Sequence, residues 1–293
     1  MRKRYLHNKY GKREEFWDKN WDGDWERKLA ISPPVNSCLV TCVMKYLKPN
    51  MLLLEGGCGD ARYVRHFTDL GVKTVGVDFA RATVQRINEH LPNLDVRVGD
   101  IRNLDFPEDF FDGYYSGGVI EHFEDGVDPQ LAEAHRVLKA GGYFFVTVPH
   151  MNLSRRCAAV CFSTRMKIDL DGRKSYHKER VHEFRVEDPP EGFHFHEYVF
   201  STAEMRGFLS SHGFSIVAEM CFSSPFGLLD IEFYHRLIGA GRTQRTIFNK
   251  MFAIPLRCAR LVEGSDSFFC RVLSDTLGIV FGNLKLYVCR TEK

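Results

Sequence analysis

Three acidic residues stand at or just after the ends of short apolar runs in the first hundred residues: Glu55, Asp78 and Asp100. Gly57 and Gly59 follow the first of them, and glycine lets a backbone approach a ligand closely. A carboxylate accepts hydrogen bonds from two neighbouring hydroxyls, so Asp78 suits a ribose, while Glu55 suits an ammonium group. Asp100 suits the amino group of an adenine. The pattern therefore indicates a cationic ligand with a ribose and an adenine, although any one such carboxylate could instead be a helix cap.

The glycine turn does not fit two common nucleotide sites. A dinucleotide fingerprint needs Gly-x-Gly-x-x-Gly, and Arg62 stands where the third glycine belongs. A phosphate-binding P-loop needs Gly-Lys followed by Ser or Thr, and this chain has no such sequence. The turn counts against a nicotinamide or flavin enzyme and against a P-loop nucleotidase.

Three histidines follow the segments that we expect to form the same site. His122 comes after the apolar run 113–116, His150 after 143–148, and His196 shortly before a helix. Histidine titrates near neutral pH and is the most common general base, so all three are candidate catalytic residues, with His122 favoured. The alternative for each is a structural histidine held by hydrogen bonds.

The elements that must position these side chains alternate between strands and helices from residue 51 onward. We expect strands at 51–55, 74–77, 96–98, 113–116, 143–148, 215–220 and 284–289, with helices at 60–70, near 81–91, at 128–139 and after a capping box formed by Ser201 and Glu204. This alternation predicts an α/β fold with a mostly parallel sheet that has helices on both faces. Ligands of such sheets bind at the carboxyl edge, where the three acids would meet.

Three other segments flank or interrupt this pattern. Residues 1–50 are expected to form an N-terminal helical lid, in which Trp17, Trp21 and Trp25 recur at helical spacing. These tryptophans predict either a helix packed on the core or an aromatic lid over a cationic ligand. Residues 149–200 are expected to be a cap insertion, and residues 224–282 a helical insertion. Basic residues among the apolar clusters of 224–282 leave peripheral membrane contact open as an alternative to a helical cap.

Composition excludes several classes of protein. The 293 residues carry a formal net charge of +2, so we expect no nucleic-acid partner. The nine cysteines include no Cys-x-x-Cys pair, which favours reduced thiols over zinc or disulfides. No apolar leader and no stretch long enough to span a bilayer is visible, so we expect a cytoplasmic protein that could touch a membrane peripherally. The sequence does not predict an oligomeric state.

Five motifs together resemble the class I S-adenosylmethionine-dependent methyltransferases. They are Leu-Leu-Glu-Gly-Gly-Cys-Gly-Asp, Val-Gly-Val-Asp-Phe, Val-Gly-Asp-Ile-Arg-Asn-Leu, Phe-Asp-Gly-Tyr-Tyr-Ser-Gly-Gly-Val-Ile-Glu-His-Phe and Arg-Val-Leu-Lys-Ala-Gly-Gly. The resemblance covers residues 50–222 and 283–290. It implies a Rossmann-like seven-stranded core, assigned to 51–223 plus 283–293, with an antiparallel last strand. S-adenosylmethionine is the implied cofactor, with candidate contacts from Glu55, Gly57, Gly59, Asp78, Phe79, Asp100, Ile101 and Ser116.

The same resemblance leaves the acceptor open. We expect O- or N-methylation of a small-molecule, saccharide or lipid-linked acceptor; the alternatives are methylation of RNA or protein, or an inactive cofactor-binding scaffold. Glu121, His122 and His196 are similar to part of the metal-binding pattern of small-RNA 2′-O-methyltransferases and some quinone O-methyltransferases. Gly118 stands where that pattern has its first glutamate. With one carboxylate missing, we expect no metal.

Overall fold

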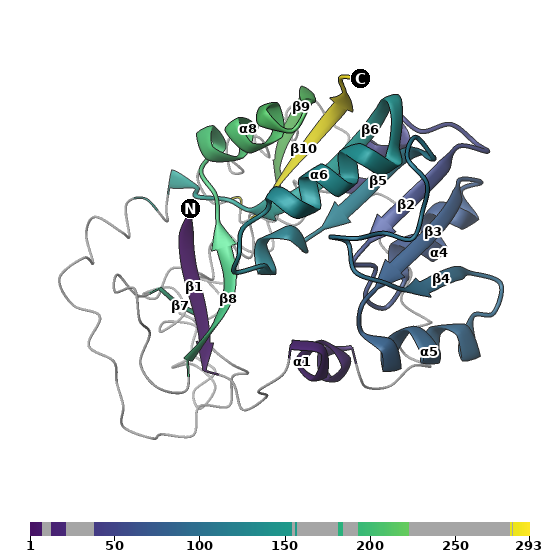
Figure 1. Cartoon of the computed structure of the whole chain (residues 1–293), viewed down its shortest axis with the longest axis horizontal. Coiled ribbons are helices and arrows are strands. Elements are labelled where there is room, and N and C mark those ends of the chain that lie inside the picture. Colours follow the sequence, from purple (N-terminus) through teal and green to yellow (C-terminus); the bar gives the residue numbers. More distant parts are fainter. Residues whose placement is uncertain are drawn as a thin grey trace, which may run out of the picture.

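A seven-stranded sheet forms the centre of the protein, as seen in the computed structural model (Figure 1). The structure describes residues 1–7, 13–21, 38–153, 156, 181–183, 193–222, 282 and 284–293. The strand order is β4-β3-β2-β5-β6-β10-β9. These strands are β2 (Leu52–Gly56), β3 (Lys73–Asp78), β4 (Asp95–Val98), β5 (Phe111–Gly117), β6 (Leu138–Pro149), β9 (Phe214–Phe222) and β10 (Leu284–Thr291).

The direction of the last strand confirms the expected topology. Strands β2 to β6 pair in parallel, whereas β10 lies between β6 and β9 and is antiparallel to both. All seven expected strands are present, each within a few residues of its predicted bounds. The Rossmann-like fold is therefore confirmed, and the carboxyl ends of β2, β3 and β5 meet at one edge of the sheet.

Helices cover both faces of the sheet, because alternate residues of the buried strands point to opposite sides. Leu54, Tyr114 and Phe144 pack in a core cluster with α6 (Asp128–Val137) and α8 (Thr202–Ser211). Leu53 and Phe145 pack on the other face with α3 (Cys38–Met44) and α4 (Arg62–Asp69). The helix α5 (Arg81–His90) covers β4. The capping box that the sequence predicted at the start of α8 is present, with Ser201 and Glu204 as its two residues.

The N-terminal segment differs from the expected helical lid. It begins with a strand, β1 (Arg2–His7), followed by the helix α1 (Arg13–Asn20). Strand β1 lies between β7 (Val181–Glu183) and β8 (Phe193–Val199) in a separate three-stranded antiparallel sheet (Figure 1). Local sequence could not show this strand, because its hydrogen-bonding partners are about 180 residues away in the predicted cap insertion. The lid and the cap insertion thus share one sheet.

Three expected segments fall wholly or partly outside the described residues. Residues 8–12 and 22–37 of the N-terminal segment lie outside them, and Trp25 is among these. The helical insertion 224–282 lies outside them except for residue 282, and so does most of the cap insertion 149–200. Among the described residues, no helix is both long and apolar enough to cross a membrane.

Candidate active site

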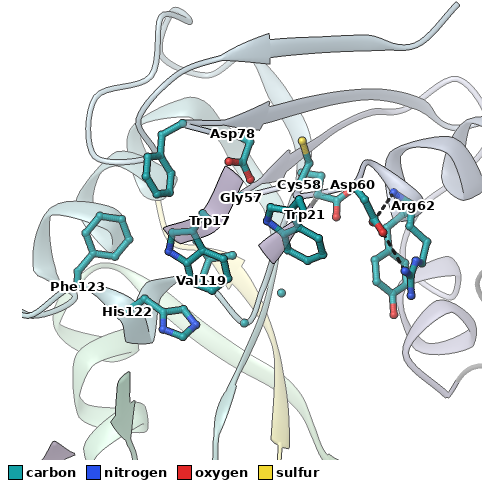
Figure 2. A pocket seen from close by; sticks show the side chains of 15 residues that line it. Trp17, Trp21, Gly57, Cys58, Asp60, Arg62, Asp78, Val119, His122 and Phe123 are labelled. Atoms are coloured by element: carbon teal, nitrogen blue, oxygen red, sulfur yellow. Dashed lines mark hydrogen bonds and ion pairs between the residues drawn. The ribbon is translucent and has the colours of Figure 1, made fainter. Parts of the chain in front are cut away.

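A cavity of about 260 Å³ lies at the carboxyl edge of β2, β3 and β5 (Figure 2). Glu55 and Gly57 line it at the end of β2, Asp78 and Phe79 at the end of β3, and Gly117 at the end of β5. The edge predicted from sequence is therefore the edge that holds the cavity. Trp17 and Trp21, Cys58, Asp60, Arg62, Tyr63, Gly118, Val119, His122 and Phe123 line the remainder.

The turn after β2 requires glycine at two positions. Gly57 and Gly59 have φ angles of +76° and +52°, in the left-handed region that side chains rarely adopt. A Cβ on Gly57 would lie 2.5 Å from a methyl carbon of Val119, and one on Gly59 would lie 2.6 Å from the ring of Trp21. The backbone of this turn is thus in direct contact with neighbouring side chains on both sides of the cavity.

Asp78 joins the glycine turn to the end of β3. Its Oδ2 accepts a hydrogen bond from the Gly59 N–H at 2.8 Å, and its Oδ1 accepts one from the Ala80 N–H at 2.9 Å. Burial raises the pKa of Asp78, and these backbone N–H groups oppose that rise. Each carboxylate oxygen can accept a second hydrogen bond, so the predicted ribose contact is compatible with this arrangement.

Glu55 is the most deeply buried acid of the cavity. Its side chain is 4% exposed, and its Oε2 has no hydrogen-bond partner among the described residues. Burial raises the pKa of Glu55 well above its usual value, and the nearby Asp60 raises it further. A buried carboxylate oxygen without a partner is costly, which fits a site completed by a cationic ligand.

Other predicted cofactor contacts lie away from the cavity lining. Asp100 pairs with Arg102 at 2.6 Å on the surface, since an arginine two residues away offers a stronger partner than an amino group. Ile101 is packed in the core cluster, and Ser116 is fully buried. Their contact with a cofactor stays a prediction.

His122 is oriented by a backbone carbonyl. It ends the short 3₁₀ helix η1 (Ile120–His122) and lines the cavity. Its Nδ1 lies 2.6 Å from the His196 carbonyl oxygen. Since a carbonyl only accepts, Nδ1 carries a proton, and in a neutral ring Nε2 is then the basic nitrogen. The Trp17 ring meets the imidazole edge-on, with centroids 4.9 Å apart.

A β-bulge explains the position of His196. In the pairing of β1 with β8, Arg4 lies opposite Glu197 and Tyr5 lies opposite Phe195, so His196 is an extra residue in its strand. Such a bulge redirects side chains. The His196 ring lies 4.9 Å from that of His122, and the two predicted histidines are therefore neighbours.

His150 lies elsewhere. It forms an isolated bridge with Phe200, is 8% exposed and is not part of the cavity lining. A catalytic role for His150 remains a prediction, and its placement gives that role no support.

The bulge also brings Glu197 beside the histidines. One ligand atom from each of His122, His196 and Glu197 lies within 4.8 Å of the others, close enough to converge on a cation. The sequence considered Glu121 for such a role instead. Glu121 is buried, and burial raises its pKa well above the usual value for a glutamate. Glu197 was missed because its neighbourhood depends on a strand irregularity that sequence does not reveal.

Comparisons with known proteins agree with the site. A family model described as a methyltransferase domain matches residues 54–146. A "Probable S-adenosylmethionine-dependent methyltransferase" of Mycolicibacterium smegmatis is 33% identical over 98 residues, covering 33% of this chain and 38% of the relative. A ubiquinone biosynthesis O-methyltransferase of Bradyrhizobium is 32% identical over 34% of this chain and 40% of the relative. A human protein named "Probable tRNA methyltransferase 9B" is 27% identical over 53% of this chain and 31% of the relative.

A solved structure extends the likeness of fold to nearly the whole chain. The complex of the Haloferax volcanii Trm112 methyltransferase activator with a candidate methyltransferase matches with a TM-score of 0.54 and 17% identity, covering 97% of this chain and 99% of that one. The curated relatives are matched over less than half of their own length. The likeness to these relatives therefore belongs to the domain around the cavity.

The fold, the glycine turn and the family match together define the class of this domain. The chain carries a class I S-adenosylmethionine-dependent methyltransferase domain, which is an enzyme domain with S-adenosylmethionine as its cofactor. The residues present fit that cofactor, because the Glu55 oxygen at the cavity is buried and has no hydrogen-bond partner among the described residues, which suits a cationic ligand. When bound, the cofactor supplies an electrophilic methyl group on a sulfonium.

Proposed function

We propose that this chain transfers a methyl group from S-adenosylmethionine to an oxygen or nitrogen of a small-molecule, saccharide or lipid-linked acceptor. One observation carries the proposal: aromatic side chains from outside the sheet, Trp17 and Trp21, line the cavity together with His122 and Phe123. Trp17 and Trp21 form what we call the aromatic wall of the cavity. With a volume of about 260 Å³, the cavity suits a small acceptor group. The O-methyltransferase relative supports the same acceptor class.

The main task of the protein in such a reaction is alignment. Displacement at the methyl carbon needs the acceptor atom in line with the methyl group and the sulfur, and good alignment can contribute about 7 to 11 kcal/mol. Glu55, Gly57, Asp78 and Phe79 would hold the cofactor, and the aromatic wall would position the acceptor.

His122 would take the proton of the acceptor. Its Nε2 is the basic nitrogen of the neutral ring, because Nδ1 donates to the His196 carbonyl. The His196 backbone thereby fixes the tautomer and the ring orientation. A general base placed in this way contributes about 10² to 10⁴-fold in rate.

Methylation of RNA is the second candidate. It is favoured by the relative that is named a probable tRNA methyltransferase. The small net charge of +2 favours the small acceptor instead, since RNA binding relies on neutralising phosphates.

The decisive experiment is calorimetry of the purified chain with S-adenosylmethionine and its demethylated product. We expect the wild type to bind S-adenosylmethionine. Asp78→Ala should lower the affinity by about 100-fold or more, because it removes two hydrogen bonds between a carboxylate and the backbone. The matched control is Asp95→Ala, an exposed acid on β4 that pairs only locally with Arg97. Absence of binding by the wild type would disprove the proposal.

The acceptor class is tested next with methyl-labelled cofactor. Label should pass to a hydroxyl or amine acceptor within a panel of phenols, quinols, amines, saccharides and lipid-linked saccharides. Label found in tRNA and not in that panel would replace the first candidate by the second. Cofactor binding with no transfer to either would indicate the inactive scaffold.

We also propose the cytoplasm as the location, with residues 224–282 as the segment that could contact a membrane. Co-sedimentation of the chain with anionic and neutral lipid vesicles tests this contact. Equal amounts of protein in the supernatant with and without vesicles would contradict the membrane contact.

A further inference from the structure

A carboxylate of α1 is hydrogen-bonded to the helix α5. Asp18 Oδ1 accepts hydrogen bonds from the Thr83 backbone N–H and from Thr83 Oγ1, both at 2.9 Å. Thr83 is the third residue of α5, and its side chain is fully buried. Asp18 therefore satisfies a backbone donor in the first turn of a helix 65 residues away in the sequence.

The start of α5 needs this partner. The residue at its N-cap position is Ala80, which offers no side-chain acceptor. By contrast, α8 has Ser201 at its own N-cap, and Ser201 accepts from the Glu204 N–H. Asp18 thus provides from α1 the cap that α5 lacks in its own sequence.

The cap lies beside the two tryptophans of the cavity wall. Trp17 precedes Asp18 directly, and Trp21 follows it by three residues, about one helical turn. The two indole rings lie 6.3 Å apart with planes 21° from parallel. Trp21 lies against Gly59 in the glycine turn. Trp17 lies against His122 (Figure 2).

The helix α1 lies outside the apolar cores of the sheet domain. None of the core clusters formed by the described residues includes a residue of α1 or Trp21. Residue contacts between α1 and α5 are the principal ones between this helix and the sheet domain. The hydrogen bonds between Thr83 and Asp18 therefore lie where they can fix the position of α1 and of both indole rings.

We propose that Asp18 is a positioning residue of the active site: by capping α5 it holds Trp21 over the cofactor turn and Trp17 against His122. This inference rests on the proposed function for its catalytic meaning. The Asp18 carboxylate would thereby influence both the ring that covers the glycine turn and the orientation of His122, the proposed base.

The experiment uses the full chain with Trp25→Phe, so that indole fluorescence reports Trp17 and Trp21, since the chain has three tryptophans. In this background Asp18→Ala should increase quenching by acrylamide, weaken cofactor binding by about 3- to 30-fold and raise KM for the cofactor. Asp18→Asn should restore all three values, because an asparagine carbonyl oxygen can accept both hydrogen bonds.

Ser201→Ala is the matched control, because it removes a helix cap of the same kind from α8, whose residues do not line the cavity. It should lower the thermal midpoint at least as much as Asp18→Ala and leave quenching and cofactor affinity unchanged. Equal quenching and equal affinity in Asp18→Ala and the parent would overturn the inference. Failure of Asp18→Asn to restore them would also overturn it, because the cap would then not be the cause.

The two proposals fail separately. Acrylamide quenching is measured without any ligand, so it tests the position of the wall even if the parent binds no S-adenosylmethionine. Absence of binding by the parent counts against the proposed function, whereas unchanged quenching counts against the role of Asp18.

Discussion

The two sides of the cavity are built in different ways. The side that we assign to the cofactor comes from one continuous stretch: Glu55 and Asp78 lie at the ends of the neighbouring parallel strands β2 and β3, and the glycine turn follows β2. The side that we propose for the acceptor combines α1 and the turn after β5 with the bulged strand β8 behind His122, and these segments lie up to about 180 residues apart in the sequence. The first side is therefore encoded by local sequence, whereas the proposed acceptor side depends on contacts between distant segments. The family match over 54–146 falls on the first side and omits most of the second.

Replacing His122 is the strongest test of whether the two sides of the cavity act separately. We expect His122→Ala to lower kcat by about 10²- to 10⁴-fold, because it removes the base, while the cofactor dissociation constant changes less than about twofold. Single-turnover kinetics and calorimetry measure the two quantities. His90→Ala, an exposed histidine at the end of α5, is the control. A parallel loss of cofactor binding would show that His122 belongs to the cofactor side.

Gly57→Ala is the corresponding change on the cofactor side. The new Cβ would collide with Val119 at 2.5 Å, and the φ of +76° would strain the backbone of an alanine. We expect cofactor affinity to fall by about 10- to 100-fold, measured by calorimetry. Adding Val119→Ala should recover only the part caused by the collision.

The control for this substitution is Gly207→Ala. Gly207 lies within α8, and a Cβ there would meet no atom within 4 Å. It should leave cofactor affinity unchanged and stabilise the fold slightly, since alanine favours a helix. Tight binding by Gly57→Ala would contradict the close approach of backbone and ligand.

A smaller effect on the cofactor side depends on pH. Burial raises the pKa of Glu55 in the free protein, and a bound cation would favour its ionised form and lower that pKa. Binding therefore releases a proton. Affinity should rise with pH up to the raised pKa of free Glu55, by at most about tenfold per unit, and level off above it.

Calorimetry across pH 5 to 9 measures this slope. Glu55→Gln should bind more weakly at high pH and show a flatter profile, because glutamine does not titrate. An identical slope in both proteins would assign the proton to another group.

The smallest expected effect concerns metal on the acceptor side. We predict that a chelator such as EDTA leaves methyl transfer unchanged, as the sequence pattern indicates no metal. Loss of activity that Mg²⁺ or Mn²⁺ restores would contradict this prediction. It would point to His122, His196 and Glu197, and Glu197→Gln should then reduce the restored activity.

Sequence predicted the strands and the turn at the cavity edge well because their signals are local. The strands after residue 51, the glycine turn, Asp78 and the capping box of α8 each depend on residues within a few positions of one another. For Asp100 the same reasoning missed a partner. It lies after the expected strand, yet Arg102 is its partner in the structure.

The acceptor side was predicted only in part. Histidines 122 and 196 were expected beside one pocket and are neighbours, but the strand β1, the bulge at His196 and the proximity of Glu197 were not foreseen. Each depends on strand pairing across the chain. His150 was expected on the same grounds as His122, and it lies outside the cavity lining.

The sequence by itself determined the fold, the class of domain and the turn that approaches the cofactor, since hydrophobic periodicity and glycine conformation are properties of short segments. Only the tertiary structure decided which aromatic rings cover that turn and which nitrogen of His122 is basic. The hydrogen bond between Asp18 and Thr83, the one between His122 and the His196 carbonyl, and the pairing of β1 with β8 each join distant parts of the sequence, so no short segment contains both partners of any of them.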